Sequence, residues 1–209
     1  MTNTTNWLAA LATIAIVLIY EGVLLLVQNR SPNRLARSVH ATLREEWFLA
    51  ISNQPGSEIL AVQTLRNSLM SATMTATTAV LGLMGTITLL APSLNSTFAV
   101  ADSLHFTARL SLELLLMAIL FASSVFSAMA VRYYNHAGFI CSMPVGSAER
   151  QRWSATGVIY LRRAGILYSW GLRHLLMVAP VLASIAFPLA GPVAAVVLVM
   201  ALFGFDRFA

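Results

Sequence analysis

The sequence predicts an all-α fold, a polytopic transmembrane helix bundle, and three observations support this prediction. Hydrophobic residues make up 58% of the chain and charged residues 10%, whereas charged residues approach about a quarter of an average soluble domain. Several apolar stretches approach the ~20 residues that a helix needs to cross the hydrocarbon layer. The 13 basic residues, all arginines, avoid these stretches. Lipid is therefore the expected solvent for most of the chain.

A single integral-membrane helical domain is expected over residues 1-209, because no shift in composition and no Ser/Pro-rich linker divides the chain. Cytoplasmic amphipathic helices are expected in the segments 31–66 and 147–170. Five spans are predicted, at about 7-27, 69-91, 107-131, 172-187 and 192-206.

The last apolar stretch decides between five spans and four. From Leu175 to Phe205 there are 31 residues without a charge, and as one helix they would be ~46 Å long, against a hydrocarbon thickness of ~30 Å. Pro188, Gly191 and Pro192 lie in the middle, where two prolines and a glycine favour the end of one helix and the start of another. A C-terminal helical hairpin with five spans is favoured. One kinked fourth span remains the alternative.

The arginines also predict an orientation. Segment 28–66 contains five of them and segment 132–173 contains six, whereas segment 92–109 contains only Arg109. Lys and Arg in short loops mark the cytoplasmic side of a membrane. The residues before Trp7 carry no charged side chain and no small-residue cleavage site precedes Gln28, which favours an uncleaved anchor with its N-terminus outside.

The first arginine-rich segment has an amphipathic pattern. Leu35, Val39, Leu43 and Trp47 recur at four-residue spacing beside arginines, which predicts a helix with a narrow apolar stripe. Such a helix is expected to lie on the inner membrane surface. In the second segment, Ser147 to Trp170, arginines alternate with tryptophan and tyrosine, which are favoured at the membrane interface.

Small residues line one stripe of the second predicted span at a 3.5-residue period. This helix-packing seam consists of Ser68, Ser71, Thr75, Thr78, Gly82 and Gly85. Small residues allow close contact between membrane helices, so another helix is expected to pack there. The rival interpretation is the polar wall of a substrate path, but Ser and Thr hydroxyls often bond back to their own helix.

Two carboxylates, Glu21 and Glu113, fall inside predicted spans, where ionisable groups are costly and are candidates for function. Glu113 follows Arg109 at the i, i+4 spacing that lets opposite charges meet. Glu21 could pair with Arg66 or Arg173. The alternative is that the two carboxylates lie at opposite ends of a path that relays protons or binds a cation.

A polar ring is expected where the spans reach the cytoplasm. Its members are Arg66, Asn67, Arg132, Asn135, His136 and Arg173. Arginine is the preferred fork for phosphate or carboxylate, so the ring is a candidate site for an anion or a lipid head group. The alternative is that these residues cap helix ends and fix the topology.

Four sequence blocks stand out: Gln63 to Thr73, Arg132 to Phe139 with Asn135, His136 and Gly138, Gly171-Leu172-Arg173, and Gly191-Pro192 with the closing Asp206. With these blocks the chain resembles the uncharacterised bacterial membrane proteins known as domain of unknown function 599. The resemblance implies a bacterial inner (cytoplasmic) membrane location and supplies no activity.

The expected function is non-catalytic, because the sequence has no GxSxG, no HExxH and no Gly-rich phosphate loop. No cofactor or metal is expected, and Cys141 is the single cysteine. The chain is expected to be an accessory or scaffolding subunit of a larger membrane complex. Its expected partners are anionic lipid head groups and other membrane subunits or further copies of itself, and not nucleic acid. The alternative is a small transporter or channel for an ion or anionic solute that uses Glu21, Glu113 and the arginine ring.

Overall fold

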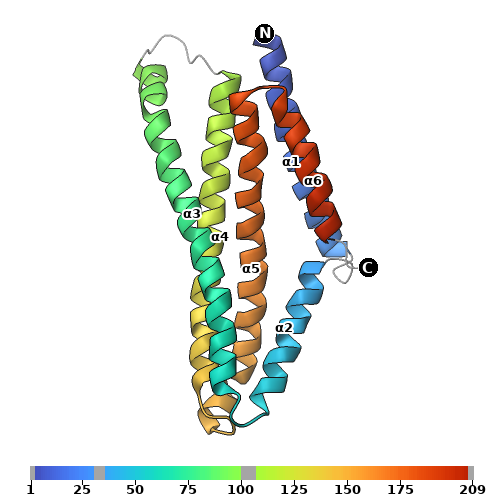
Figure 1. The fold of residues 1–209 in the computed structure, drawn as a ribbon, viewed down its shortest axis with the longest axis vertical. Helices are drawn as coiled ribbons and strands as arrows, with labels where there is room; N and C mark the ends of the chain where they lie inside the picture. Colours follow the sequence, from blue (N-terminus) through green and yellow to red (C-terminus); the bar gives the residue numbers. More distant parts are fainter. Residues whose placement is uncertain (1–2, 31–35, 100–106, 207–209) are drawn as a thin grey trace.

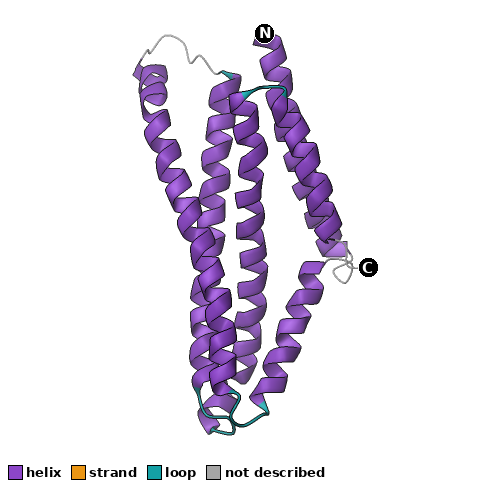
Figure 2. Cartoon of the chain, viewed as in Figure 1, coloured by secondary structure: helices purple, strands orange, loops and turns teal. Residues whose placement is uncertain are grey.

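The computed structural model describes residues 3–30, 36–99 and 107–206, and in these ranges every regular element is an α-helix (Figure 2). Two of the six helices have 17 residues and the other four have 28 to 42. Their bounds are α1 Asn3–Arg30, α2 Ala36–Ser52, α3 Glu58–Ala99, α4 Ala108–Ser142, α5 Ala148–Ala186 and α6 Ala190–Asp206.

The three longest helices, α3, α4 and α5, run side by side along most of the molecule (Figure 1). The paired helices α1 and α6 flank one half of this trio, and α2 flanks the other half. The N-terminus lies at the end of the molecule opposite to the α2–α3 and α4–α5 turns. The chain therefore has two sections that share the same three helices.

Each section has its own apolar core. One core joins α1, α4, α5 and α6 around residues such as Val17, Leu116 and Val181. The second joins α2 to α3, α4 and α5 around Phe48 and Leu161. We call the second section the arm and define it as α2 with residues 58–72 of α3, 130–142 of α4 and 148–164 of α5. We call the remainder the membrane section.

The length of the helices shows why the two sections differ. A hydrocarbon layer of ~30 Å corresponds to about 20 residues of helix. About 20 residues counted along α4 from Arg109 end near Met129, where the arm begins. The same length counted back along α5 from Ala186 ends near Ile166. The arm therefore extends beyond one face of a bilayer that is centred on the membrane section.

Four helices are long and apolar enough to cross a membrane: Asn3–Val27, Glu58–Ala91, Ala108–Ser142 and Ala148–Ala186. The predicted polytopic helix bundle is thus confirmed. The predicted C-terminal hairpin is also present, because α5 ends at Ala186, the chain turns, and α6 returns beside α5 and α1. With 17 residues, α6 is ~25 Å long and is a short fifth apolar helix.

Two sets of predicted segments are parts of longer helices, and one predicted helix is placed differently from the expectation. The predicted span 69-91 is part of one uninterrupted helix, α3, and the amphipathic segment 147–170 joins the span 172-187 in another, α5. α2 does not lie across the bundle as a helix on the membrane surface would. It runs along the arm and packs mainly on α5 (Figure 1). Phe48, next to the predicted stripe, is fully buried, whereas Val39 and Trp47 of the stripe are half-buried and Leu43 is exposed. Leu35, the first residue of that stripe, lies outside the described residues.

α4 and α5 approach closely at Gly171. The Ser123 hydroxyl of α4 donates a hydrogen bond of 2.7 Å to the Gly171 carbonyl oxygen. A Cβ atom at position 171 would lie 2.2 Å from the Ser127 Oγ atom. Glycine is required here because any side chain would occupy the space of the neighbouring helix.

Candidate functional site: an ionic cluster between three helices

A buried group of three side chains joins α1, α5 and α6. The Arg173 Nη1 atom donates to the Asp206 Oδ2 atom at 2.8 Å and to the Tyr20 hydroxyl oxygen at 2.9 Å. The Arg173 Nη2 atom donates to Asp206 Oδ1, and the Tyr20 hydroxyl donates to Asp206 Oδ2. The Arg173 side chain is 6% exposed and that of Asp206 is 13% exposed. We call this group the ionic cluster.

The ionic cluster lies inside the membrane section. Arg173 is seven residues beyond Ile166 on α5, and Tyr20 is seven residues before Val27 on α1, so both positions are ~10 Å from the arm-side edge of the hydrocarbon layer. Asp206 reaches the same depth because α6 is short and ends there. A charge at this depth is expensive unless a partner neutralises it.

The three side chains of the cluster satisfy most of one another's hydrogen-bonding groups. Both carboxylate oxygens of Asp206 accept hydrogen bonds from Arg173, in the two-pronged geometry that makes Arg–carboxylate pairs strong. The Arg173 Cζ atom also lies 5.7 Å from the centre of the Tyr20 ring, within the range of a cation–π interaction. Among the described residues, the Arg173 Nε atom has no hydrogen-bond acceptor. The cluster is therefore well built to tie α1 and α6 to α5.

The structure separates Arg173 from the other five members of the expected polar ring. The Arg163 Cζ atom lies 5.9 Å from the centre of the Tyr133 ring, so residues near 132 on α4 are level with Arg163 on α5. Arg173 is ten residues further along α5, which is about 15 Å. It is also buried, whereas the other five residues are exposed: Arg66, Asn67, Arg132, Asn135 and His136.

The two intramembrane carboxylates have different surroundings. The Arg109 Nε atom donates to Glu113 Oε1 at 2.8 Å, so the i, i+4 pair is formed, with the Glu113 side chain 10% exposed. Glu21 is half-buried and directly follows Tyr20. The carboxylate that pairs with Arg173 belongs to Asp206.

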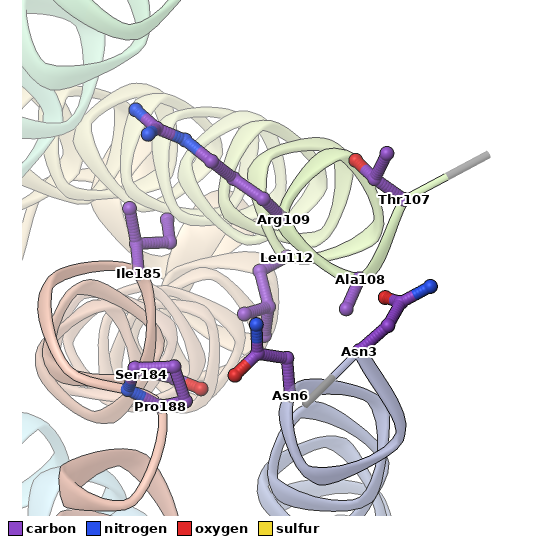
Figure 3. A pocket seen from close by; sticks show the side chains of 9 residues that line it. All are labelled: Asn3, Asn6, Thr107, Ala108, Arg109, Leu112, Ser184, Ile185 and Pro188. Atoms are coloured by element: carbon purple, nitrogen blue, oxygen red, sulfur yellow. The ribbon is translucent and has the colours of Figure 1, made fainter. Parts of the chain in front are cut away.

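A small pocket lies at the end of the membrane section opposite to the arm. It has a volume of about 220 Å³ and lies between the first turns of α1 and α4 and the α5–α6 turn. Figure 3 shows Asn3 and Asn6 on one side and the Arg109 guanidinium extending away from them. The Asn6 Oδ1 and Ser184 Oγ atoms are buried with no hydrogen-bond partner among the described residues. This pocket can accept a small polar molecule that donates hydrogen bonds.

The small-residue seam of α3 lies mostly beside the surface that packs on α4. Ser71, Thr78, Gly82 and Gly85 are exposed, Ser68 is half-buried and Thr75 is buried. The hydroxyls of Ser71 and Thr75 donate to backbone carbonyls one turn earlier in the same helix. A Cβ atom at Gly82 would lie 3.1 Å from Leu120 of α4. The seam therefore touches α4 at its margin and leaves most of its small residues uncovered in this chain.

The arm contains an apolar cleft between α2 and α3. Its volume is about 340 Å³. Leu65, Tyr134 and Leu161 are its buried lining residues, and Leu43 and Thr64 are exposed at its rim. The lining residues are Leu43, Arg44, Trp47, Thr64, Leu65, Ser68, Tyr134 and Leu161.

Two members of the ionic cluster are not among the predicted site residues. The signal for Asp206 is its position, because it is the first charged residue after an apolar stretch of 31 residues that begins at Leu175. Tyr20 carries no such signal, since a tyrosine in a span is also common near a membrane interface.

Fold and site together define a multi-pass helical membrane protein whose C-terminal hairpin is held by a buried ionic cluster. The chain belongs to the DUF599 family of proteins of unknown function, which matches residues 8–209. Neither a curated protein nor a solved structure matches the chain.

Proposed function

We propose that this protein is a non-catalytic accessory or scaffolding subunit of a bacterial inner-membrane complex. The observation that carries the proposal is the arm, a helical projection with an apolar cleft between α2 and α3. A surface of this kind suits a helix of a partner protein, because an amphipathic helix binds by placing its apolar face in a hydrophobic groove.

Exposed apolar side chains on the arm support the same function. Leu43, at the rim of the cleft, is 59% exposed, Ile59 is 74% exposed and Phe139 is 68% exposed. In a bilayer centred on the membrane section, the arm lies beyond the hydrocarbon layer, so lipid tails do not cover these residues. Apolar surface that faces water in this way marks contact sites for other proteins.

The ionic cluster supports a structural rather than a catalytic role for its residues. Asp206 accepts hydrogen bonds from both Arg173 and Tyr20, so its oxygens are already engaged.

Anionic lipids are the second proposed partner, because exposed Arg66 and Arg132 lie where the arm meets the membrane section. Basic residues at this depth attract anionic head groups.

A photo-crosslinking amino acid at Thr64, on the rim of the cleft, is expected to give one discrete adduct in native membranes. The same amino acid at Ala155, which is exposed on α5 and does not line the cleft, is the matched control. The adduct should contain either a second copy of this chain or one membrane protein. The proposal is wrong if Thr64 and Ala155 give the same products and the protein is a lone monomer in mild detergent.

We further propose that the arm is cytoplasmic and the N-terminus is outside, on the basis of the arginine distribution. In a Cys141→Ala background, Asn3→Cys should react with a membrane-impermeant maleimide on spheroplasts. Asn53→Cys, which is exposed at the tip of the arm, should react only after lysis. Labelling in the reverse pattern would contradict this orientation.

The second candidate function is a small transporter for an ion or an anionic solute. It is favoured by the polar pocket beside Arg109 and by the ionic cluster deeper in the same section. An apolar layer that includes Ala10, Val17 and Val181 lies between the two. Transport would require this layer to open. Loss of solute flux on Glu113→Gln in vesicles would favour transport over the scaffold.

A further inference from the structure

We propose that the tip of the arm binds the phosphate group of a small water-soluble molecule, with Arg150 as the main binding residue. The site is a pocket of about 290 Å³ between the end of α2 and the α4–α5 turn. Its lining residues are Ser52, Asn53, Val145, Gly146, Arg150, Gln151 and Ser154.

Arg150 is a buried guanidinium with unused donors. It is 2% exposed. Its Nη1 atom donates to the backbone carbonyl oxygens of Cys141 at 3.0 Å and Met143 at 2.6 Å. Its Nε and Nη2 atoms have no hydrogen-bond acceptor among the described residues. A buried donor without an acceptor costs free energy, more so on a charged group. Two of the three nitrogen atoms of this guanidinium therefore lack an acceptor among the described residues.

The two unused atoms form the edge of the guanidinium that recognises oxyanions. The N–H bonds of Nε and Nη2 are nearly parallel, and two such bonds fit two oxygens of a phosphate or carboxylate. The carbonyl bonds of Nη1 fix the orientation of this edge. Arg150 is thus held in place by one side of its head group, while the other side is buried without an acceptor among the described residues.

Other groups of the pocket can complete the coordination of a phosphate. The Ser52 hydroxyl is also buried with no hydrogen-bond partner among the described residues. The side chains of Gln151 and Ser154 line the same pocket and can donate. Gly146 has φ +86° and nothing within 4 Å of where a Cβ would be. The turn therefore leaves open space at Gly146, which lines the same pocket.

A phosphate suits this pocket better than a carboxylate, because it presents more oxygens to the several donors. The Glu58 carboxylate interacts electrostatically with Arg150 and accepts a hydrogen bond of 2.8 Å from the Val145 backbone N–H. Glu149 in the first turn of α5 is exposed. Arg150 donates its hydrogen bonds to backbone oxygens and not to either carboxylate.

The position of the pocket distinguishes a soluble phosphate from a lipid head group. Arg150 precedes Ile166, at the membrane edge of α5, by 16 residues, which is about 24 Å of helix. A lipid phosphate at the membrane surface does not reach that far along the arm. A soluble phosphomonoester is therefore the proposed ligand.

The test uses the full chain in mild detergent and inorganic phosphate as the probe. Phosphate is expected to raise the unfolding temperature in a saturable manner, relative to chloride at equal ionic strength, because a ligand stabilises the state that binds it. Arg150→Gln should abolish this rise. Gln151→Glu, which keeps the shape of the side chain, should weaken phosphate binding by about tenfold through like-charge repulsion. Gln63→Glu adds the same charge at an exposed position of α3 outside the pocket and should leave binding unchanged.

Two results would overturn the proposal. The first is a phosphate response that is absent, or that Gln63→Glu reduces as much as Gln151→Glu does, because the response would then reflect overall charge. The second result would show that the bound phosphate belongs to a lipid. To test this, the stability of the protein is compared in nanodiscs of phosphatidylcholine alone and in nanodiscs that also contain phosphatidic acid. An Arg150-dependent stabilisation that needs phosphatidic acid would assign the pocket to a lipid and not to a soluble molecule.

Discussion

Asp206→Asn is expected to destabilise the protein by about 3–5 kcal/mol, because it leaves the buried guanidinium of Arg173 without its counter-ion. The Arg173 side chain is 6% exposed, so water cannot replace the lost carboxylate. The expected result is a large fall in the midpoint of unfolding by dodecyl sulfate, together with early release of α6. Near-ultraviolet circular dichroism and proteolysis between α5 and α6 would measure the two effects.

Two companion variants make this result specific to the ion pair. Tyr20→Phe removes one hydrogen-bonding hydroxyl and keeps both charges, so about 1–2 kcal/mol is expected. The double variant Arg173→Leu with Asp206→Leu removes both charges and should recover much of the stability lost in Asp206→Asn. If Asp206→Asn costs no more than Tyr20→Phe, the ionic cluster does not hold the hairpin.

Gly171→Val is expected to separate α4 from α5 and to cost about 3 kcal/mol, the upper part of the usual range for overpacking. A Cβ atom at this position would lie 2.2 Å from Ser127 Oγ and 3.3 Å from the Ser123 carbonyl oxygen. The second contact is with backbone, which cannot rotate away. The displaced helix would also lose the hydrogen bond from Ser123 to the Gly171 carbonyl.

The matched control is Gly85→Val, in α3 of the membrane section. A Cβ atom at Gly85 meets nothing within 4 Å, so the isolated chain should tolerate valine there. Thermal unfolding in detergent would compare the two variants. Equal destabilisation by both would mean that valine harms these helices irrespective of packing.

The sequence predicts the elements whose signals are local. Pro188, Gly191 and Pro192 break the last apolar stretch, and the structure turns between Ala186 and Ala190. Arg109 and Glu113 are one turn apart, and a single helix is enough to bring them together. Local patterns of this kind depend on covalent geometry and helical period alone.

Contacts between residues that are distant in the sequence are harder to predict from it. Asp206 and Arg173 are separated by 33 positions, and their pairing depends on where α6 ends relative to α5. The sequence pattern groups Arg173 with Arg66 and Arg132, because it does not give the depth of a residue within a continuous helix. The amphipathic pattern of α2 likewise shows which residues avoid water. It does not show whether they meet lipid or α5.

The unbroken course of α5 from the tip of the arm to the far side of the bilayer has a mechanical consequence. Its 39 residues form a rod of about 58 Å. A lever of that length that tilts by about 5° moves its far end by about 5 Å. Small changes in bilayer thickness or tension at one end would therefore become displacements of atomic-contact size at the other.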